Sequence, residues 1–392
     1  MTDKLLRSTA LALAVLWCSI CAQSVMAQAP EGPLPPPPPG TKIQPTPSEA
    51  LAKISARVTL VNTPVTVRDA NGAMLQDLDE KDFVVTDNGV PQKITHFDVG
   101  GDPLSLVILV ETSSRVDSFL LQLRKTGILL SEQVMGPDAE AAVVGFDDSL
   151  KTLQGFTRSH DAIEAAFSAL KTEESAIHLF DAMAAGVEML SGRRKPTQET
   201  PVPGRRVLLI ISEALDTGSD ARLGEVLRRA QLENVTIFSV GLSSTRAELQ
   251  SKPRENAPTP ITPPGTYGMP GPPGTVPTPG AGNNQGFDLV ALAQVLVEHT
   301  KSAATKHSLE VGAVATGGGY YSTYKGRSIE SAIDEIGGEL HSQYMISYEP
   351  KSRSEDSQDF GYHQISVSLV ADKAPGKKIT TRPGYYIPPP GS

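Results

Sequence analysis

The central part of the chain alternates apolar runs of strand length with amphipathic stretches of helix length. Apolar runs without polar alternation are typical of strands buried on both faces, and helix-length connections between them favour a mostly parallel sheet covered by helices on both sides. The predicted strands are Leu104–Val110, Ala141–Phe146, Leu150–Phe156 as an edge strand, Val207–Ile211 and Val235–Val240. The predicted helices are 116–134, 161–171, 180–190, a segment around 223–230, and 328–339, which leads into Tyr344–Tyr348.

Residues 56–99 contain shorter strand patterns separated by turn signals, which predict a small all-β unit. Turns are predicted at Asn71-Gly72 and Asn88-Gly89. Strands this short need a second sheet to cover them, which the C-terminal stretch can supply. The strand candidates are Val58–Val61, Val65–Val67, Phe83–Val85, Ile94–Phe97, Ile365–Leu369 and Ile379–Thr381.

The first 27 residues predict a cleavable secretory signal. Lys4 and Arg7 precede an apolar run, Leu11–Ala22, that is too short to span a bilayer, and Ala27 offers a small residue for cleavage. We therefore expect an exported protein, periplasmic or extracellular, with an uncleaved anchor as the alternative. Both cysteines lie inside the signal, so the mature chain is expected to contain no disulfide.

Two proline-rich tracts have no helical or strand periodicity, and we expect them to be a spacer and a disordered insertion. A formal charge of −9 disfavours nucleic acid and anionic membrane surfaces as partners, and no later segment is apolar enough for a membrane span. An envelope or extracellular protein is the expected partner. The predicted organisation is 1–27 signal, 28–53 proline-rich spacer, 54–101 small β domain, 102–349 α/β domain with a disordered insertion at 253–286, and 350–392 C-terminal β segment and tail.

Polar residues follow the predicted strands where ligands bind in open α/β sheets, at the carboxyl ends. They occur in residues 111–115 after the first strand, in 176–181 at the start of a helix, and in 212–216 after the fourth strand.

These segments, in this order, resemble the von Willebrand factor A (VWA) domain, and more narrowly the exported VWFA-related family common in acidobacterial proteomes. The resemblance covers nearly all of the predicted mature chain and implies a Rossmann-like domain that binds other proteins. It is carried by Asp82-Phe83, Asp87-Asn88-Gly89, residues 110–115, Leu179-Phe180-Asp181-Ala182, Gly317-Gly318-Gly319, Ser342-Gln343-Tyr344 and Arg382-Pro383-Gly384-Tyr385-Tyr386.

The resemblance also implies a metal-ion-dependent adhesion site. In that site a divalent cation is held by Asp-x-Ser-x-Ser after the first strand, a threonine before a helix and an aspartate after the fourth strand, all of them oxygen ligands. In this chain Glu111 stands at the first aspartate and Ser113 is retained, whereas Arg115 replaces the second serine. Ile177 stands for the threonine and Glu213 for the last aspartate. The candidate metal ligands are therefore Glu111, Ser113 and Glu213.

This ligand set predicts a degenerate site. Glutamate adds a methylene that a tight magnesium shell does not accommodate, and Ile177 offers no oxygen. Arg115 brings a permanent positive charge that can itself pair with Glu111 or Glu213. We therefore expect no cofactor, with a divalent cation such as Mg²⁺ as the alternative.

Other candidate sites have simpler structural interpretations. The seven histidines lack zinc-site spacing and are expected at the surface or at helix caps. Gly317–Gly319 is expected to be a helix-to-strand turn, because no Lys-Ser or Lys-Thr follows it. Tyr320, Tyr321 and Tyr324 are expected to pack on the sheet, with a binding patch as the alternative.

No catalytic constellation can be placed from the sequence, although Ser, His and Asp all occur in it. The sequence therefore predicts a non-enzymatic, exported protein-interaction module with a degenerate adhesion site. A metal-dependent adhesin or sensor and a secreted hydrolase with an unrecognised site remain alternatives.

Overall fold

The structure, a computed structural model, describes residues 60–100, 103–193, 204–242, 307–323, 328–350 and 361–387. All of them belong to one unit, Val58–Ser392. The predicted signal, the proline-rich spacer, the insertion at 253–286 and Tyr324 lie outside the described residues. Of the helices that are described, none has the length and apolar character needed to cross a membrane.

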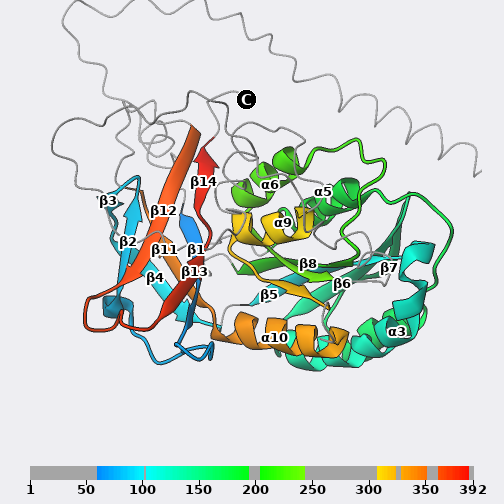
Figure 1. The fold of residues 1–392 in the computed structure, drawn as a ribbon, viewed down its shortest axis with the longest axis horizontal. Helices are drawn as coiled ribbons and strands as arrows, with labels where there is room; N and C mark the ends of the chain where they lie inside the picture. Colours follow the sequence, from blue (N-terminus) through cyan, green and yellow to red (C-terminus); the bar gives the residue numbers. More distant parts are fainter. Residues whose placement is uncertain are drawn as a thin grey trace, which may run out of the picture. The chain divides into compact units, whose positions relative to one another are not determined.

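A six-stranded sheet in the order β10-β9-β8-β5-β6-β7 forms the centre of the α/β domain (Figure 1). Its strands are β5 (Leu104–Glu111), β6 (Glu140–Phe146), β7 (Leu150–Thr157), β8 (Arg205–Ser212), β9 (Val235–Gly241) and β10 (Tyr320–Ser322). Neighbouring strands are parallel except β7, which is antiparallel to β6 at the edge. Counted along the chain, the order is 3-2-1-4-5-6, that of a doubly wound sheet. The predicted fold class, a Rossmann-like α/β domain with a mostly parallel sheet, is confirmed.

Helices cover both faces of this sheet because its central strands are apolar on both sides. On β5, Leu106 and Ile108 lie in the core under α3, α4 and α10, whereas Val107 and Leu109 lie in the core under α5, α6 and α9 (Figure 1). The predicted helix at 116–134 is three segments, a 3₁₀ turn, an α-helix and a π-helical turn. The helical segments are η2 (Ser114–Phe119), α3 (Leu120–Leu129), η3 (Leu130–Val134), α4 (His160–Ser168), α5 (Leu179–Leu190), α6 (Leu223–Leu232), α9 (Ser308–Thr316) and α10 (Ile329–Ser342).

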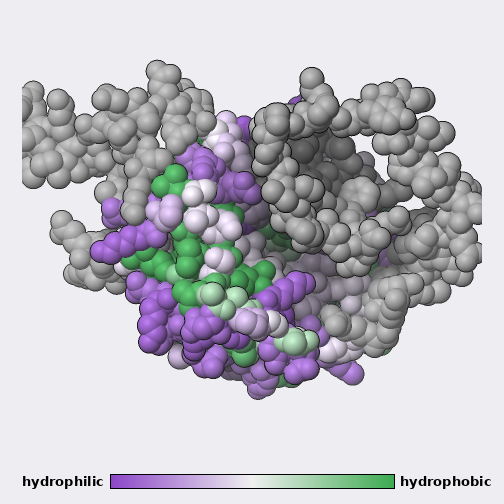
Figure 2. Space-filling model, turned by 60° about the vertical axis from the view of Figure 1, so that its left-hand side comes forward, coloured by the Kyte–Doolittle hydropathy of each residue, from purple (hydrophilic) through white to green (hydrophobic). Residues whose placement is uncertain are grey.

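Two four-stranded antiparallel sheets pack around a third core and form a β-sandwich. Their orders are β13-β1-β11-β4 and β14-β12-β2-β3. Figure 2 turns this part toward the viewer and shows hydrophobic residues gathered in the middle of the face with hydrophilic residues around them. The elements are β1 (Val61–Arg68), η1 (Glu80–Asp82), β2 (Phe83–Asp87), β3 (Val90–Pro91), β4 (Ile94–Val99), β11 (Tyr344–Tyr348), β12 (Gly361–Leu369), β13 (Lys378–Thr381) and β14 (Gly384–Ile387).

The strand at 344–348 lies in the β-sandwich and not in the α/β domain, in which the sequence places everything up to residue 349. β11 pairs with β1 on one side and β4 on the other, so both of its backbone edges are hydrogen-bonded there. Tyr344 is fully buried against the rings of Phe83 and Phe97. An apolar run indicates burial but does not say which core provides it, which is why the assignment failed.

The N-terminal and C-terminal β segments form these two sheets together. β12 pairs with β2, and β13 pairs with β1. The two strands predicted around Pro64 are one continuous strand, β1, although Val58 and Thr59 lie outside the described residues. Asn88 and Gly89 form the tight turn between β2 and β3, with φ values of 47° and 79° that suit this residue pair. β14, within the final tyrosine motif, is a strand that the sequence patterns did not predict.

The glycine triplet ends α9 and lets the chain turn into β10, as the sequence predicts. Gly317 has a φ of 80°, the left-handed conformation that favours glycine after a helix. Gly318 lies so close to β9 that an added Cβ would stand 2.0 Å from the carbonyl oxygen of Ile237. The triplet therefore serves helix termination and close packing.

Because that contact is with backbone, Gly318→Ala is expected to lower the free energy of unfolding by about 1–3 kcal/mol. Gly155→Ala is the matched control, since Gly155 on β7 has nothing within 4 Å of an added Cβ, and it should change stability by no more than about 0.5 kcal/mol. Urea denaturation followed by circular dichroism measures both. Equal effects at the two positions would contradict the packing role of Gly318.

Candidate functional site

Glu111 ends β5 at the carboxyl edge of the parallel sheet, and its carboxylate is enclosed by hydrogen-bond donors. The residue is 1% exposed. Ser113 Oγ donates to Oε1 at 2.5 Å, while Ser212 Oγ at 2.7 Å and the backbone N–H of Glu213 at 2.9 Å donate to Oε2. Because β5 and β8 are neighbours in the sheet, their ends bring residues about a hundred positions apart into contact. Both oxygens of Glu111 are therefore engaged within the protein.

Glu213 forms an ion pair with Arg115. Arg115 Nε donates to Glu213 Oε2 at 2.8 Å, with the glutamate side chain 2% exposed and the arginine side chain 31% exposed. Of the two partners predicted for Arg115, the structure pairs it with Glu213. The other carboxylate oxygen, Glu213 Oε1, is buried without a hydrogen-bond partner among the described residues. The structure thus brings Glu111, Ser113 and Glu213 together and places a guanidinium beside them.

The electrostatic environment disfavours the ionised form of Glu111. Burial raises the pKa of its carboxyl above the ordinary value, and the nearby Glu213 carboxylate raises it further. The hydrogen bonds from Ser113, Ser212 and the Glu213 N–H oppose this rise but do not cancel it. Glu111 therefore keeps its proton to a higher pH than an exposed glutamate.

Ile177 contributes no polar group to this edge. Its side chain is buried in the core under α5, α6 and α9. Its backbone N–H donates to Thr217 Oγ1 at 2.8 Å, and that hydroxyl donates in turn to the Ile177 carbonyl at 3.2 Å. The loop after β8 is thereby tied to the segment before α5.

The sequence reasoning missed Asp147, a buried carboxylate just after β6. It accepts hydrogen bonds from Thr112 Oγ1 at 3.1 Å and Ser149 N at 2.9 Å, and an ion pair from Lys151 at 3.2 Å. Burial alone would raise the pKa of Asp147, but these donors hold it below its ordinary value. The Asp-Asp-Ser sequence after a buried strand was the signal for such a turn.

The N-terminus of α5 is capped by the loop that follows β8. Ser219 Oγ accepts from the N–H groups of Phe180 at 3.0 Å and Asp181 at 3.1 Å, and Asp216 Oδ1 accepts from Phe180 N at 3.3 Å. Side chains of the loop after β8 thus accept hydrogen bonds from the first N–H groups of this helix and lie at the positive end of its dipole. Asp216, one of the polar residues singled out after the fourth strand, has this structural role.

The histidine expectation is wrong for His363, which is 1% exposed in the β-sandwich core. Its Nδ1 lies 3.0 Å from Asp87 Oδ1. Asp87 Oδ2 also accepts from Tyr385 at 2.7 Å and Tyr348 at 3.1 Å. Burial would raise the pKa of Asp87, but these contacts hold it below its ordinary value. His363 can be buried because Asp87 provides its ring with a hydrogen-bonding partner. The sequence does not reveal this contact, because the two residues are far apart along the chain.

The remaining candidates are a tyrosine on the sheet, possible metal-ligand clusters and the two serines at the carboxyl edge. Tyr321 is buried, and its hydroxyl donates to Glu339 on α10, as expected for a strand tyrosine packed on the sheet. Within the described part of the chain, no three His, Cys, Asp or Glu residues are grouped as a metal site would need. Ser113 and Ser212 both donate to a carboxylate, and neither has a histidine partner among the described residues.

No family model and no curated protein matches the sequence. Among solved structures, the chain is similar to the conserved hypothetical protein BatB from Bacteroides thetaiotaomicron, with 10% identity, a TM-score of 0.38, and 60% of this chain and 98% of that chain covered. An aerotolerance-related membrane protein from Bacteroides fragilis matches with 12% identity, a TM-score of 0.35 and the same coverage.

The vWF domain of the type V pili tip protein Mfa5 from Porphyromonas gingivalis matches with 14% identity and a TM-score of 0.27, covering 31% of this chain and 41% of that chain. At these identities the likeness concerns the fold alone, and the contacts described above belong to this chain.

The raised pKa of Glu111 predicts a pH-dependent stability. Above the ordinary value of 4.5 the unfolded chain loses this proton while the folded chain keeps it. The free energy of unfolding therefore falls as pH rises through that interval. Glu111→Gln removes the titration, so the stability of the wild type relative to this variant should fall as pH rises above about 4.5.

Urea denaturation at steps of pH measures this difference. Glu174→Gln removes an exposed carboxylate and reports the effect of net charge alone. If the free energy of unfolding of the wild type rises with pH relative to that of Glu111→Gln, the raised pKa of the buried carboxyl is contradicted.

Proposed function

We propose that this chain is an exported, non-enzymatic protein-interaction module whose VWA-like domain carries a degenerate metal-ion-dependent adhesion site. The observation that carries the proposal is the Arg115–Glu213 ion pair beside the saturated Glu111 carboxyl. The Arg115 guanidinium lies beside the Glu213 carboxylate that would have to bind a divalent cation, and its positive charge would repel that cation. Export is supported by the signal pattern in the first 27 residues.

The hydrogen bonds of Glu111 support a site that is closed by the protein itself. A cation would have to displace the hydroxyl groups of Ser113 and Ser212 from the Glu111 oxygens, and the raised pKa of this carboxyl weakens it further as a metal ligand. Ile177 points into the core and supplies no oxygen. The hydroxyls of Ser113 and Ser212 are held by the Glu111 carboxyl, and neither serine has a histidine partner among the described residues, which favours a structural role over acyl or phosphoryl transfer.

The rim of the same edge supports a role in protein binding. Thr217 and Asp220 are exposed in the loop after β8, and Arg115 is one-third exposed at the mouth of the network. Their neighbours are fixed by the hydrogen bonds to Ile177 and to the start of α5. A rigid rim of polar side chains around a closed centre is suited to recognition without a bound metal.

The first test is metal binding. Isothermal titration of the purified protein with Mg²⁺ or Mn²⁺ is expected to give no tight one-to-one binding, because Arg115 and the saturated Glu111 exclude the ion. Tight stoichiometric binding that Glu111→Ala abolishes would contradict the proposal. Arg115→Ser leaves Glu111, Ser113 and Glu213 in place, so binding gained only in that variant identifies the guanidinium as the group that closes the site.

The second test is partner binding at the rim. Cross-linking pull-downs from the native cell envelope, with and without chelator, are expected to give the same partner in both. Asp220→Arg should reduce its capture at least tenfold by reversing a rim charge, which corresponds to about 1.4 kcal/mol. Lys378→Glu, a charge reversal on exposed β13 in the β-sandwich, is the matched control and should leave capture unchanged. Equal capture by all three proteins would contradict binding at this edge.

One observation favours a second candidate, a metal-dependent adhesin. Glu213 Oε1 is buried and lacks a partner among the described residues, as a free metal ligand would. In that case the chelator would abolish capture of the partner, whereas the proposed module is insensitive to it.

A further inference from the structure

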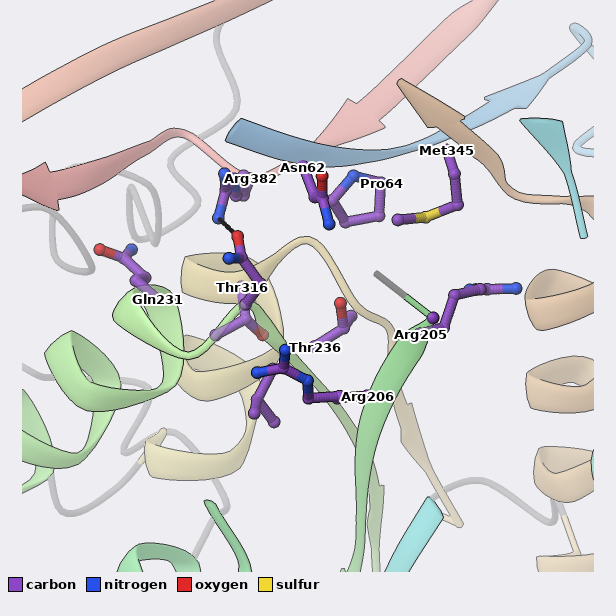
Figure 3. A pocket seen from close by; sticks show the side chains of 12 residues that line it. Asn62, Pro64, Arg205, Arg206, Gln231, Thr236, Thr316, Met345 and Arg382 are labelled. Atoms are coloured by element: carbon purple, nitrogen blue, oxygen red, sulfur yellow. Dashed lines mark hydrogen bonds between the residues drawn. The ribbon is translucent and has the colours of Figure 1, made fainter. Parts of the chain in front are cut away.

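At the opposite, amino end of the parallel sheet, a small cavity lies where β8 and β9 begin next to β1, β11 and the start of the final tyrosine motif (Figure 3). Its volume is about 20 Å³, the size that holds a single water-sized particle. We call it the junction cavity. Its wall includes Arg205, Arg206 and Arg382 but no carboxylate side chain.

Arg205 takes no part in the cavity's chemistry, because its guanidinium is directed to α10. It donates to the Leu340 carbonyl at 2.6 Å and to Gln343 Oε1 at 2.8 Å, and Figure 3 shows it pointing away from the other two arginines. Arg206 and Arg382 are different. Each is more than nine-tenths buried, and the Nε–H of each lacks a hydrogen-bond partner within the described residues.

Arg382 forms no ion pair with a carboxylate among the described residues, and Asp87 interacts with its charge without such a contact. Its Nη1 donates to Asn234 Oδ1 at a long 3.5 Å, and its guanidinium carbon lies 5.8 Å from the centre of the Tyr385 ring. Burial lowers the pKa of Arg382 below its ordinary value, but a guanidinium does not lose its proton in a protein. Leaving such a buried charge without a counter-ion is costly.

Unlike Arg382, Arg206 lies within ion-pair distance of a carboxylate, but its Nε–H has no hydrogen-bond partner among the described residues. Its Nη1 donates to the Glu233 carbonyl and lies 3.6 Å from Glu233 Oε2. Burial lowers the pKa of Arg206, with the Glu233 carboxylate opposing it. Asn62 on β1 adds a donor, because its Oδ1 already accepts from Ser347 and its amide nitrogen is the group left for the cavity. The cavity thus offers N–H donors from three side chains.

Gln231 Oε1 also lines this region and has no partner among the described residues. It is an acceptor, and it suits a water that hydrates the occupant. The excess of donors and the two positive charges select a negative occupant, and a volume of about 20 Å³ suits a single small ion.

We propose that the junction cavity binds a monatomic inorganic anion, chloride under ordinary conditions, between Arg206 and Arg382. The anion supplies the contact ion pair that Arg382 does not form with the described residues, and it joins the amino end of the parallel sheet to the β-sandwich. This role is independent of the carboxyl edge, so it stands whether or not the proposed interaction function holds.

The decisive experiment is diffraction from crystals of the purified protein soaked in sodium bromide. Bromide replaces chloride and scatters anomalously, so an anomalous peak in contact with Arg206 and Arg382 is the expected result. A cavity with water-level density and no anomalous peak, or one filled by another part of the chain, overturns the proposal.

Thermal unfolding gives an independent measure. At matched ionic strength, sodium chloride should raise the melting temperature above that in sodium gluconate, whose anion is too large for the cavity, by about 2–4 °C for each tenfold excess over the dissociation constant. Arg382→Met should abolish this difference, and Lys378→Met, which removes one exposed charge, should keep it. If Arg382→Met does not fold, Arg206→Met takes its place. A difference of equal size in all variants would show a general salt effect and overturn the proposal.

Discussion

The burial of β5 on both faces is the constraint on which the rest of the α/β domain depends. Leu106 and Ile108 are fully buried on one side, and Val107 and Leu109 on the other. A strand of this kind cannot face water, so helices must cover both faces, and parallel pairing with crossover helices is the arrangement that provides them. The parallel order then places the ends of β5 and β8 side by side. That neighbourhood brings Glu111 against Ser212 and the Glu213 backbone.

The two ends of this sheet solve the problem of buried charge in different ways. At the carboxyl edge the charges are matched within the chain, with Arg115 on Glu213 and three donors on Glu111. At the amino edge Arg382 is buried with only a long contact to a side-chain amide and a distant ring. The first arrangement gives each carboxyl group a donor from the chain itself, which supports recognition without a cation. The second leaves Arg382 without an ion pair among the described residues, which supports an anion from solution.

Three of the seven motifs that carry the resemblance, Gly317–Gly319, Ser342–Tyr344 and Arg382–Tyr386, meet at the junction between the α/β domain and the β-sandwich. Gln343, of the Ser-Gln-Tyr motif, accepts from Arg205 and donates to the Gly317 carbonyl and to Thr66 on β1. An added Cβ on Gly317 would meet the backbone of Arg382, which opens the final tyrosine motif. These motifs are far apart in sequence and meet in one place. In this chain they therefore serve packing at the junction.

The sequence by itself determined the α/β class, most strand positions, the turns at Asn88-Gly89 and Gly317–Gly319, and the candidate residues at the carboxyl edge. The class, the strands and the turns follow from local periodicity and from glycine conformations, which neighbouring residues alone decide, whereas the candidate residues at the carboxyl edge were implied by the resemblance to VWA domains. Only the tertiary structure decided that β11 joins the β-sandwich, that Arg115 pairs with Glu213, that His363 is buried against Asp87, and that Arg206 and Arg382 line one cavity. Each of these depends on contacts between residues distant in sequence, because the core that buries an apolar run and the partner that neutralises a charge are set by packing across the whole fold.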